Sequence, residues 1–419
     1  MVGQIAGMRG EILFLSHRVP FPPNRGDKIR SHHILRHLAS LAKVHVATFA
    51  DDAADIAEEA ELAALTASHC LLLRRKTLVR AGLEALASGQ PVSLTAFHCA
   101  ELAAYVRKVL AERPIRTIYA YSGQMGQYIP ADFAGRVVFD FVDVDSAKFE
   151  AYAETGSGPR RWIDAREGRL LAAEEARLAL RSEVSLLVSN EEAALFRARL
   201  SPQTRSACDV RALRNGIDSQ LFDPALCQPA AQMLACGGPR TIFTGQMDYA
   251  PNVAAALRVI ERLLPALREQ FPAASFHVVG RNPPPELRAC HGQNGVYVWG
   301  AVADIRDWLT AADLALVPLE LARGVQNKVL EAMAMALPVV LTPSAATGIG
   351  GSDAKHYAVA ESDADLVARA SALLVAPAKG TAMGLEARRF AVEGLSWQAT
   401  LAPLGAMLGL PQRAARHAA

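Results

Sequence analysis

The chain has 419 residues, of which 51% are hydrophobic and 21% charged, and its formal net charge is +2. A domain usually holds about 100–200 residues, so this length predicts two or three globular domains. The small net charge excludes a strongly electrostatic nucleic-acid binder, and the 6% aromatic content argues against a base-stacking platform.

The cysteines and the apolar runs indicate the compartment. Six cysteines are scattered along the chain without a CxxC pair or a cluster at zinc-ligand spacing. This pattern predicts reduced thiols and a cytoplasmic protein. No stretch approaches the roughly 20 apolar residues of a membrane span. We therefore expect at most a peripheral contact, at the inner face of the cytoplasmic membrane.

The first half of the chain alternates short apolar runs with longer amphipathic stretches. Strands are predicted at Glu11–Ser16, Val44–Phe49, Thr117–Ala120, Val137–Phe141 and Ser185–Val188. Helices are predicted at Lys28–Leu41, Ala53–Leu65, Ala100–Ala111 and Ile163–Ser182. Strand–helix alternation of this kind predicts a parallel sheet that is covered on both faces.

A second series of the same kind follows a connecting segment at Asn215–Pro239. Its predicted strands are Thr241–Thr244, Ser275–Val279, Val296–Trp299, Leu314–Val317 and Val339–Thr342. Its predicted helices are Asn252–Leu267, Ile305–Ala311 and Lys328–Ala336. Two α/β domains in tandem predict a cleft between them, with ligands beyond the carboxyl ends of the strands.

One loop in the second half has the character of a phosphate site. It contains Gly324 and leads from a predicted strand into a helix that carries Lys328 and Glu331. Free N–H groups and the positive dipole end of a helix N-terminus favour phosphate. Lys328 could add a charge for a pyrophosphate, and Glu331 could accept hydrogen bonds from ribose hydroxyls. The alternative is an i,i+3 ion pair between the two side chains on a solvated face.

The same segment resembles a known family. The sequence EAMAMALPVV at 331–340 is similar to the EAMAxGxPVV signature of retaining glycosyltransferases of the GT-B architecture, family 4. Asn215-Gly216-Ile217-Asp218, Thr244-Gly245, Val279-Gly280 and Ser396-Trp397 agree in order and spacing. Segments 16–30, 139–148, 245–252 and 322–335 resemble, more narrowly, the sugar transferases associated with exosortase (PEP-CTERM) systems, which serve bacterial exopolysaccharide assembly.

This resemblance implies an α/β fold class with two Rossmann-like, doubly wound domains that face each other across a cleft. An acceptor-side domain is expected over residues 9–214 and a domain that binds the nucleotide-sugar donor over 215–395. Residues 396–419 are expected to form a helix that crosses back to the first domain, followed by a frayed tail.

The activity that the resemblance implies is transfer of a sugar from a nucleotide diphosphate sugar to a hydroxyl of a glycan or lipid-linked glycan. The enzyme would be a retaining, hexosyltransferase-type enzyme without a metal ion or cofactor, and without a nucleic-acid partner. Two alternatives stay open: a nucleotide-sugar 2-epimerase on the same fold, and a non-catalytic, nucleotide-sugar-binding scaffold of a polysaccharide machine. The scaffold is suggested by Arg323, which stands where the family has a sugar-facing glutamate.

The donor site implied by the resemblance lies in the second domain. Gln246 and Asn252 stand in the region where the family has cations after the first glycine turn, so the pyrophosphate charges are expected from Lys328, Arg323 and Arg281. Lys328 and Arg323 are also catalytic candidates, because a cation stabilises the leaving diphosphate. The full set is Gly245, Gly280, Arg281, Gly324, Asn327, Lys328 and Glu331.

The acceptor side is expected in the first domain. Gly26 lies at a strand-to-helix turn that resembles the family's glycine loop, where it would let the transferred sugar approach as part of the catalytic machinery. His17, Arg25 and Asp27 are expected beside the acceptor. The alternative for this turn is an ordinary connection with Asp27 as the helix N-cap.

Three aspartates lie near the end of a predicted strand of the first domain, Asp140 within the strand and Asp143 and Asp145 just beyond it. Asp143-Val144-Asp145 has the form of a metal-binding DxD, a reading we reject because that motif belongs to the donor site of the other glycosyltransferase architecture. We expect Asp140 on the acceptor side, or Asp143 as a catalytic residue, to orient the acceptor hydroxyl. The alternative is a set of loop and capping aspartates.

The stretch Trp162–Arg181 is basic and amphipathic. It could rest on anionic lipid, where a lipid-linked acceptor would reside. The alternative is a solvated helix face.

Overall fold

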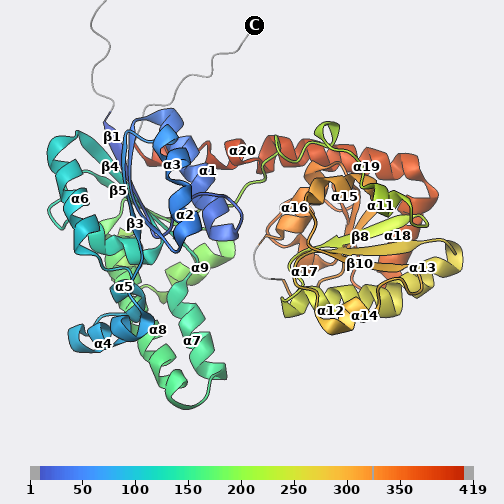
Figure 1. Ribbon diagram of the computed structural model, residues 1–419, viewed down its shortest axis with the longest axis horizontal. Coiled ribbons are helices and arrows are strands. Elements are labelled where there is room, and N and C mark those ends of the chain that lie inside the picture. The colour runs from blue at the N-terminus through green and yellow to red at the C-terminus, as the bar shows by residue number, and fades with distance from the viewer. Residues whose placement is uncertain (1–9, 323–324, 410–419) are drawn as a thin grey trace, which may run out of the picture. The chain divides into compact units, whose positions relative to one another are not determined.

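The computed structural model describes residues 10–322 and 325–409. Its chain splits into two compact units, Met1–Arg214 together with Leu401–Ala419, and Asn215–Thr400. Each unit is built on one parallel sheet with helices on both faces (Figure 1). The predicted fold class of two doubly wound α/β domains is confirmed.

The sheet of the first unit has the strand order β3-β2-β1-β4-β5-β6-β7. Strand β1 is buried along its whole length, as expected for a central parallel strand covered on both faces. The chain order reverses between β1 and β4, which creates a switch point at their carboxyl ends. The strands are β1 Glu11–Ser16, β2 Val44–Ala50, β3 Ser68–Leu73, β4 Ile115–Tyr121, β5 Arg136–Val142, β6 Val184–Leu187 and β7 Val210–Ala212.

The helices of the first unit differ from the predicted set in two ways. The predicted helix Ala53–Leu65 is two helices, α2 and α3, which meet at Glu58. The helices α4, α5, α7, α9 and α10 and the 3-10 helix η1 were not predicted. The full set is α1 Gly26–Leu41, α2 Ala53–Ala57, α3 Glu59–Leu65, α4 Leu78–Ser88, α5 Val92–Thr95, α6 Ala100–Glu112, η1 Gly123–Tyr128, α7 Asp145–Thr155, α8 Gly158–Arg181, α9 Asn190–Arg199 and α10 Pro202–Ala207.

The second unit has a sheet of strand order β10-β9-β8-β11-β12-β13, again with a reversal, between β8 and β11. Its strands are β8 Arg240–Thr244, β9 Ser275–Val279, β10 Val296–Gly300, β11 Leu314–Val317, β12 Val339–Leu341 and β13 Ala358–Val359. Its helices are η2 Pro224–Leu226, α11 Ala231–Leu234, α12 Ala250–Arg258, η3 Val259–Leu263, α13 Leu264–Gln270, α14 Pro285–Ala289, α15 Ile305–Ala311, α16 Asn327–Ala334, α17 Pro343–Ala346, α18 Asp363–Val375, α19 Pro377–Phe390 and η4 Ala391–Leu395.

The C-terminal segment, with α20 Trp397–Leu401 and α21 Leu404–Met407, returns to the first unit as predicted. The hydroxyl of Thr117 donates to the carbonyl of Leu408 (3.3 Å), and Arg136 Nη1 donates to the carbonyl of Met407 (3.1 Å). Leu404 is fully buried there. Across the described ranges, no helix combines the length and apolar character needed to cross a membrane.

Helix α16 ends in a left-handed residue that is not glycine. Ala336 has φ +56°, and the N–H of Leu337 donates to the carbonyl of Ala332 (3.0 Å), a bond that closes the last turn. An L-residue in this region is strained because its Cβ crowds the backbone, by about 1–2 kcal/mol. The glycine that the family signature has at this position would relieve that strain.

We predict that Ala336→Gly stabilises the second unit by about 1 kcal/mol, since glycine adopts positive φ without a Cβ clash. Thermal unfolding followed by circular dichroism should show a rise in Tm of about 2–4 °C. The matched control is Ala332→Gly in the interior of the same helix, which should destabilise by about 1 kcal/mol. A loss of stability in both variants would contradict the interpretation.

Candidate functional site

Two glycines close the carboxyl ends of neighbouring strands in the second unit. Gly245 follows β8 and Gly280 follows β9, and the N–H of Gly245 donates to the carbonyl of Val279 (3.1 Å). A Cβ on Gly280 would lie 1.6 Å from the carbonyl oxygen of Gly245, so no side chain fits there. A Cβ on Gly245 would lie 3.2 Å from Cε of Lys328. The two turns therefore make room for the lysine at the end of the sheet.

Lys328 is held at this edge by a residue far away in the sequence. Its Nζ donates to Oδ1 of Asn252 (2.7 Å) and lies 5.0 Å from the centre of the Phe243 ring. Nδ2 of Asn252 donates in turn to the carbonyl of Gln246 (2.8 Å). Burial lowers the pKa of Lys328 to about 8. An ammonium group in this setting favours an anionic ligand, which would replace part of its lost hydration.

Glu331 lies one turn further along α16. Burial raises the pKa of Glu331 to about 7, and the positive charge of Lys328 offsets this only in part. Within 10–322 and 325–409, its side chain forms no hydrogen bond and no ion pair, so the alternative of an ion pair with Lys328 is wrong. A half-buried carboxylate without donors costs free energy, and a ligand with hydroxyl groups would supply them.

The other residues predicted for the donor site are Arg281, Asn327, Arg323 and Gly324. Arg281 follows the β9 turn with an exposed side chain, and its carbonyl accepts a hydrogen bond from the N–H of Met247 (2.8 Å). Asn327 is the first residue of α16 and is exposed. Arg323 and Gly324 lie outside the described residues. Asn252 was not among the predicted site residues, because only the fold brings it to Lys328.

A pocket of about 370 Å³ opens in the first unit at the carboxyl ends of β1, β4 and β5. It brings together four predicted residues: His17, Arg25, Asp27 and Asp143. Gly26 begins α1 beside it, and a Cβ there would meet nothing within 4 Å. The other lining residues are Arg18, Tyr121, Ser122, Gln124, Phe141, Val142, Asp145 and Lys148.

The charges of this pocket are paired. Arg18 donates to Asp27 (2.8 Å) and to Asp51 (2.7 Å), and Arg25 contacts the same two carboxylates. Burial raises the pKa of Asp27, but hydrogen bonds from His17 and Arg18 outweigh it and hold the pKa well below its usual range. Asp27 is thus ionised. It is not the helix N-cap, a position that Arg25 occupies without a side-chain bond.

His17 faces the pocket with one ring nitrogen unused. Its ring stacks on Tyr121, with centroids 5.7 Å apart, and its Nε2 lies 3.6 Å from Oδ2 of Asp27. The Nδ1 atom is buried and forms no hydrogen bond with any residue that the structure describes. A ligand group in the pocket could supply that partner.

Asp140 does not line the pocket, which corrects the expectation that its carboxylate faces an acceptor. It is fully buried against Arg30, whose Nε donates to Oδ2 (3.1 Å), and it accepts from the hydroxyl of Tyr119 (2.8 Å). It also holds two strained pocket residues: Ser122 (φ +75°) donates its N–H to the Asp140 carbonyl, and Val142 (φ +70°) donates to Oδ1. Asp140 is therefore a positioning residue.

Asp143 keeps a half-buried place on the pocket wall. Lys148 Nζ bridges its carboxylate (2.8 Å) and that of Asp145 (3.2 Å). In the part of the chain that the structure describes, no group of three or more His, Cys, Asp or Glu side chains could hold a metal ion. The acidic pair is thus neutralised in part by a lysine.

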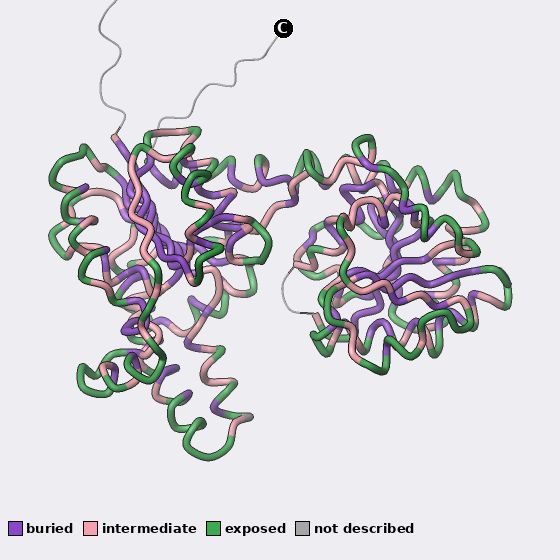
Figure 2. Tube along the Cα trace, viewed as in Figure 1, coloured by how far each residue is buried: buried purple, intermediate pink, exposed green. Residues whose placement is uncertain are grey.

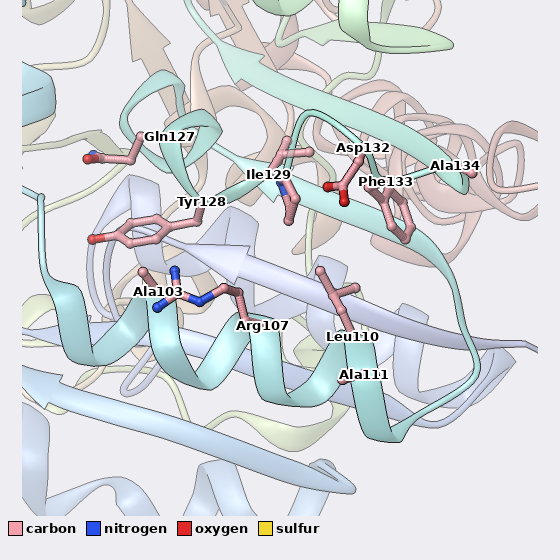
Figure 3. A pocket seen from close by; sticks show the side chains of 11 residues that line it. Ala103, Arg107, Leu110, Ala111, Gln127, Tyr128, Ile129, Asp132, Phe133 and Ala134 are labelled. Atoms are coloured by element: carbon pink, nitrogen blue, oxygen red, sulfur yellow. The ribbon is translucent and has the colours of Figure 1, made fainter.

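A second hollow of the first unit, of about 480 Å³, lies between α6 and the loop that follows η1 (Figure 3). Arg107 and Asp132 are its charged residues, and Tyr128, Ile129 and Phe133 supply much of its apolar wall. None of the predicted site residues lines it. The pocket at His17 therefore remains the acceptor-side candidate.

Comparisons with known proteins agree on the architecture. Residues 238–376 match the model of the family "Glycosyl transferases group 1". No curated protein matches the sequence. HepE of Anabaena, in complex with UDP and glucose, superposes with a TM-score of 0.60 at 16% identity, over 96% of this chain and 99% of that one. The chain has the GT-B fold.

Two other solved structures show the same GT-B fold. Sucrose-phosphate synthase of Thermosynechococcus elongatus has a TM-score of 0.61 at 15% identity, over 95% of this chain and 98% of that one. WaaG, a glycosyltransferase involved in lipopolysaccharide biosynthesis, has a TM-score of 0.56 at 17% identity, over 95% and 100%. Lys328, Glu331 and both glycine turns lie inside the segment that matches this family's model.

One prediction from these contacts concerns the buried ion pair between Arg30 and Asp140 in the first unit. Asp140→Asn leaves Arg30 buried with an uncompensated charge and should destabilise the protein by about 3–5 kcal/mol in urea unfolding. Asp143→Asn, at the pocket wall, should change stability by no more than about 0.5 kcal/mol. Similar stabilities of the two variants would show that Asp140 is no structural anchor.

A further prediction concerns the pH dependence that Glu331 gives to the stability of the protein. Its raised pKa means that the folded state holds this proton more tightly than the unfolded state, so ionisation costs stability as the pH rises from about 4.5 to about 7. Glu331→Gln should therefore stabilise the unliganded protein by about 1–2 kcal/mol at pH 8, and not at pH 4.5. Urea unfolding at both pH values measures this. Exposed Glu261→Gln is the control, and a destabilised Glu331→Gln variant at pH 8 would refute the account.

Proposed function

We propose that this protein is a glycosyltransferase that moves a sugar from a nucleotide diphosphate sugar to an acceptor hydroxyl. The observation that carries the proposal is the lysine at the end of the sheet, Lys328, which is fixed by Asn252 and followed one turn on by Glu331, a carboxylate without a partner among the described residues. These groups lie inside the segment that matches group 1 glycosyltransferases. HepE was solved with UDP and with UDP-glucose, which supports a nucleotide sugar as the donor.

In the proposed mechanism, Lys328 and the N-terminus of α16 bind the diphosphate. Lys328 gives one of its three ammonium hydrogens to Asn252, so two remain for phosphate oxygens. These charges stabilise the leaving diphosphate as the glycosidic bond breaks, with Arg281 and Arg323 as further cations. Glu331 accepts hydrogen bonds from two ribose hydroxyls. The donor side needs no metal in this scheme, because the protein supplies the positive charge.

The acceptor binds, in this proposal, in the first unit's pocket. Asp143 orients the acceptor hydroxyl, and Nδ1 of His17 gains the partner it lacks. Gly26 leaves open space beside the N-terminus of α1, where a sugar can approach the backbone. We propose transfer with retention, of a hexose, to a glycan or lipid-linked glycan in bacterial exopolysaccharide or cell-surface glycan assembly. The involvement of WaaG in lipopolysaccharide biosynthesis supports that setting.

The test is a thermal-shift panel with UDP, GDP, ADP, dTDP and CMP, with and without EDTA. One nucleoside diphosphate should raise the Tm without a need for metal, because a ligand at about a hundred times its Kd stabilises by about 2.7 kcal/mol. Lys328→Met should abolish the shift. The matched control Lys355→Met changes an exposed lysine of the second unit and should retain it.

Product analysis with the sugar nucleotide of the responding base completes the test. Sugar transferred to an acceptor, or slow donor hydrolysis, supports the proposal. A converted nucleotide sugar in the absence of any acceptor would assign the chain to the epimerases. No Tm shift with any of the five nucleotides would contradict a donor site at Lys328.

A further inference from the structure

Helix α4 of the first unit buries its small side chains and exposes its large apolar ones, the reverse of an ordinary surface helix. Its buried face consists of Ala81 and Ala85, both fully buried. Its large apolar side chains are exposed: Leu78 is 70%, Val79 76%, Leu83 65% and Leu86 59% exposed. At about 100° per residue, these four span an arc of about 140° on one side of the helix. The helix therefore presents a continuous apolar stripe to its surroundings.

A stripe of this kind indicates a partner. A surface helix normally turns its large apolar residues toward the core and its polar residues outward, because apolar burial drives the packing. Here the small alanines suffice for the contact with the unit, while the leucines would be buried only against something else. Contiguous exposed apolar patches mark interaction sites for proteins or membranes.

The N-terminal part of α8 lies close to the C-terminal end of α4. Nη2 of Arg166 donates to the carbonyl of Ala85 (2.9 Å), and its Nη1 donates to that of Gln90 (3.1 Å), so α8 is tied to the C-terminal end of α4. One turn earlier in α8, Trp162 is 59% and Ile163 49% exposed. Both elements lie at the same end of the first unit (Figure 1), where the trace is largely exposed (Figure 2).

The charges around the stripe are mostly positive. Arg75 precedes α4 and Arg80 lies on it, and both are exposed. On α8, Arg160 and Arg161 directly precede the exposed tryptophan, and Arg160 lies 3.9 Å from the carboxylate of Asp164. Glu84 is the acidic residue of α4, and it is already paired with Lys76 and Arg80. Cations beside leucines and a tryptophan match a bilayer interface, with anionic headgroups for the arginines and the upper acyl region for the apolar side chains.

We propose that the α4–α8 surface, formed by Leu78, Val79, Leu83, Leu86, Trp162 and Ile163 with Arg75, Arg80, Arg160 and Arg161, binds an anionic lipid bilayer. A protein partner would fit the apolar stripe but gives no reason for this rim of exposed arginines around a tryptophan. The stretch Trp162–Arg181, which the sequence analysis considered as a lipid-binding helix, contributes to this surface only through the first turns of α8. The leucines of the surface come from α4.

The test is co-flotation of the full-length protein with vesicles of phosphatidylcholine alone and of phosphatidylcholine mixed with phosphatidylglycerol. Wild-type protein should float with the anionic vesicles. The double variant Leu83→Asp/Leu86→Asp should bind them about tenfold more weakly, since it places charge in the apolar stripe. The matched control is Leu226→Asp/Leu385→Asp, which changes equally exposed leucines of the second unit and should bind as the wild type does.

Charge is tested separately with Arg75→Gln/Arg161→Gln, which should weaken binding to anionic vesicles and reduce its dependence on salt. All variants should keep the wild-type Tm and the nucleotide-induced Tm shift, so a failure of the lipid proposal is distinct from a failure of the donor site. Equal flotation of the Leu83→Asp/Leu86→Asp variant and its control would overturn the proposal. So would a wild-type protein that binds no vesicles but self-associates through this surface.

Discussion

The buried ion pair between Arg30 and Asp140 is the interaction on which the first unit depends. It joins α1 to β5, and Nη1 of Arg30 also donates to the carbonyl of Leu213, at the far end of the unit's sequence (2.8 Å). Burying two charges is costly, so the pair stabilises the fold only because hydrogen bonds satisfy both partners. Asp140 then fixes Ser122 and Val142 in positive φ, and these two residues shape the wall of the pocket.

In the second unit, by contrast, the two charged groups of the candidate site do not form an ion pair. Lys328 and Glu331 share one helix and are both removed from water, yet in the described residues they are not paired with each other. Among the described residues, no carboxylate forms an ion pair with the Lys328 ammonium and no donor contacts the Glu331 carboxylate, so neither group regains all the hydration that burial removes. Incompletely compensated buried charges lower the stability of a fold, and proteins usually tolerate that cost at functional sites.

In both units, unusual backbone conformations shape the end of the sheet where the candidate site lies. Gly245 and Gly280 remove side chains so that Lys328 can reach the end of the second sheet, whereas Ser122 and Val142 reach unusual φ values with side chains in place. The glycines cost little in the folded state, because no Cβ has to be accommodated. The strained residues persist only because Asp140 and the surrounding strands hold them.

The sequence by itself determined the two α/β domains and most of their strands, and it singled out Lys328 and Glu331 as candidates for a phosphate and a ribose site. Apolar runs and local periodicity suffice for that, since a buried parallel strand is apolar throughout. They fail for the edge strand Ser68–Leu73, which is only half-buried. Only the tertiary structure decided that Asn252 holds Lys328, that Asp140 is buried and that the leucines of α4 stay exposed. Each of these depends on which residues from distant parts of the chain pack against the side chain. Local sequence spacing does not reveal such long-range contacts.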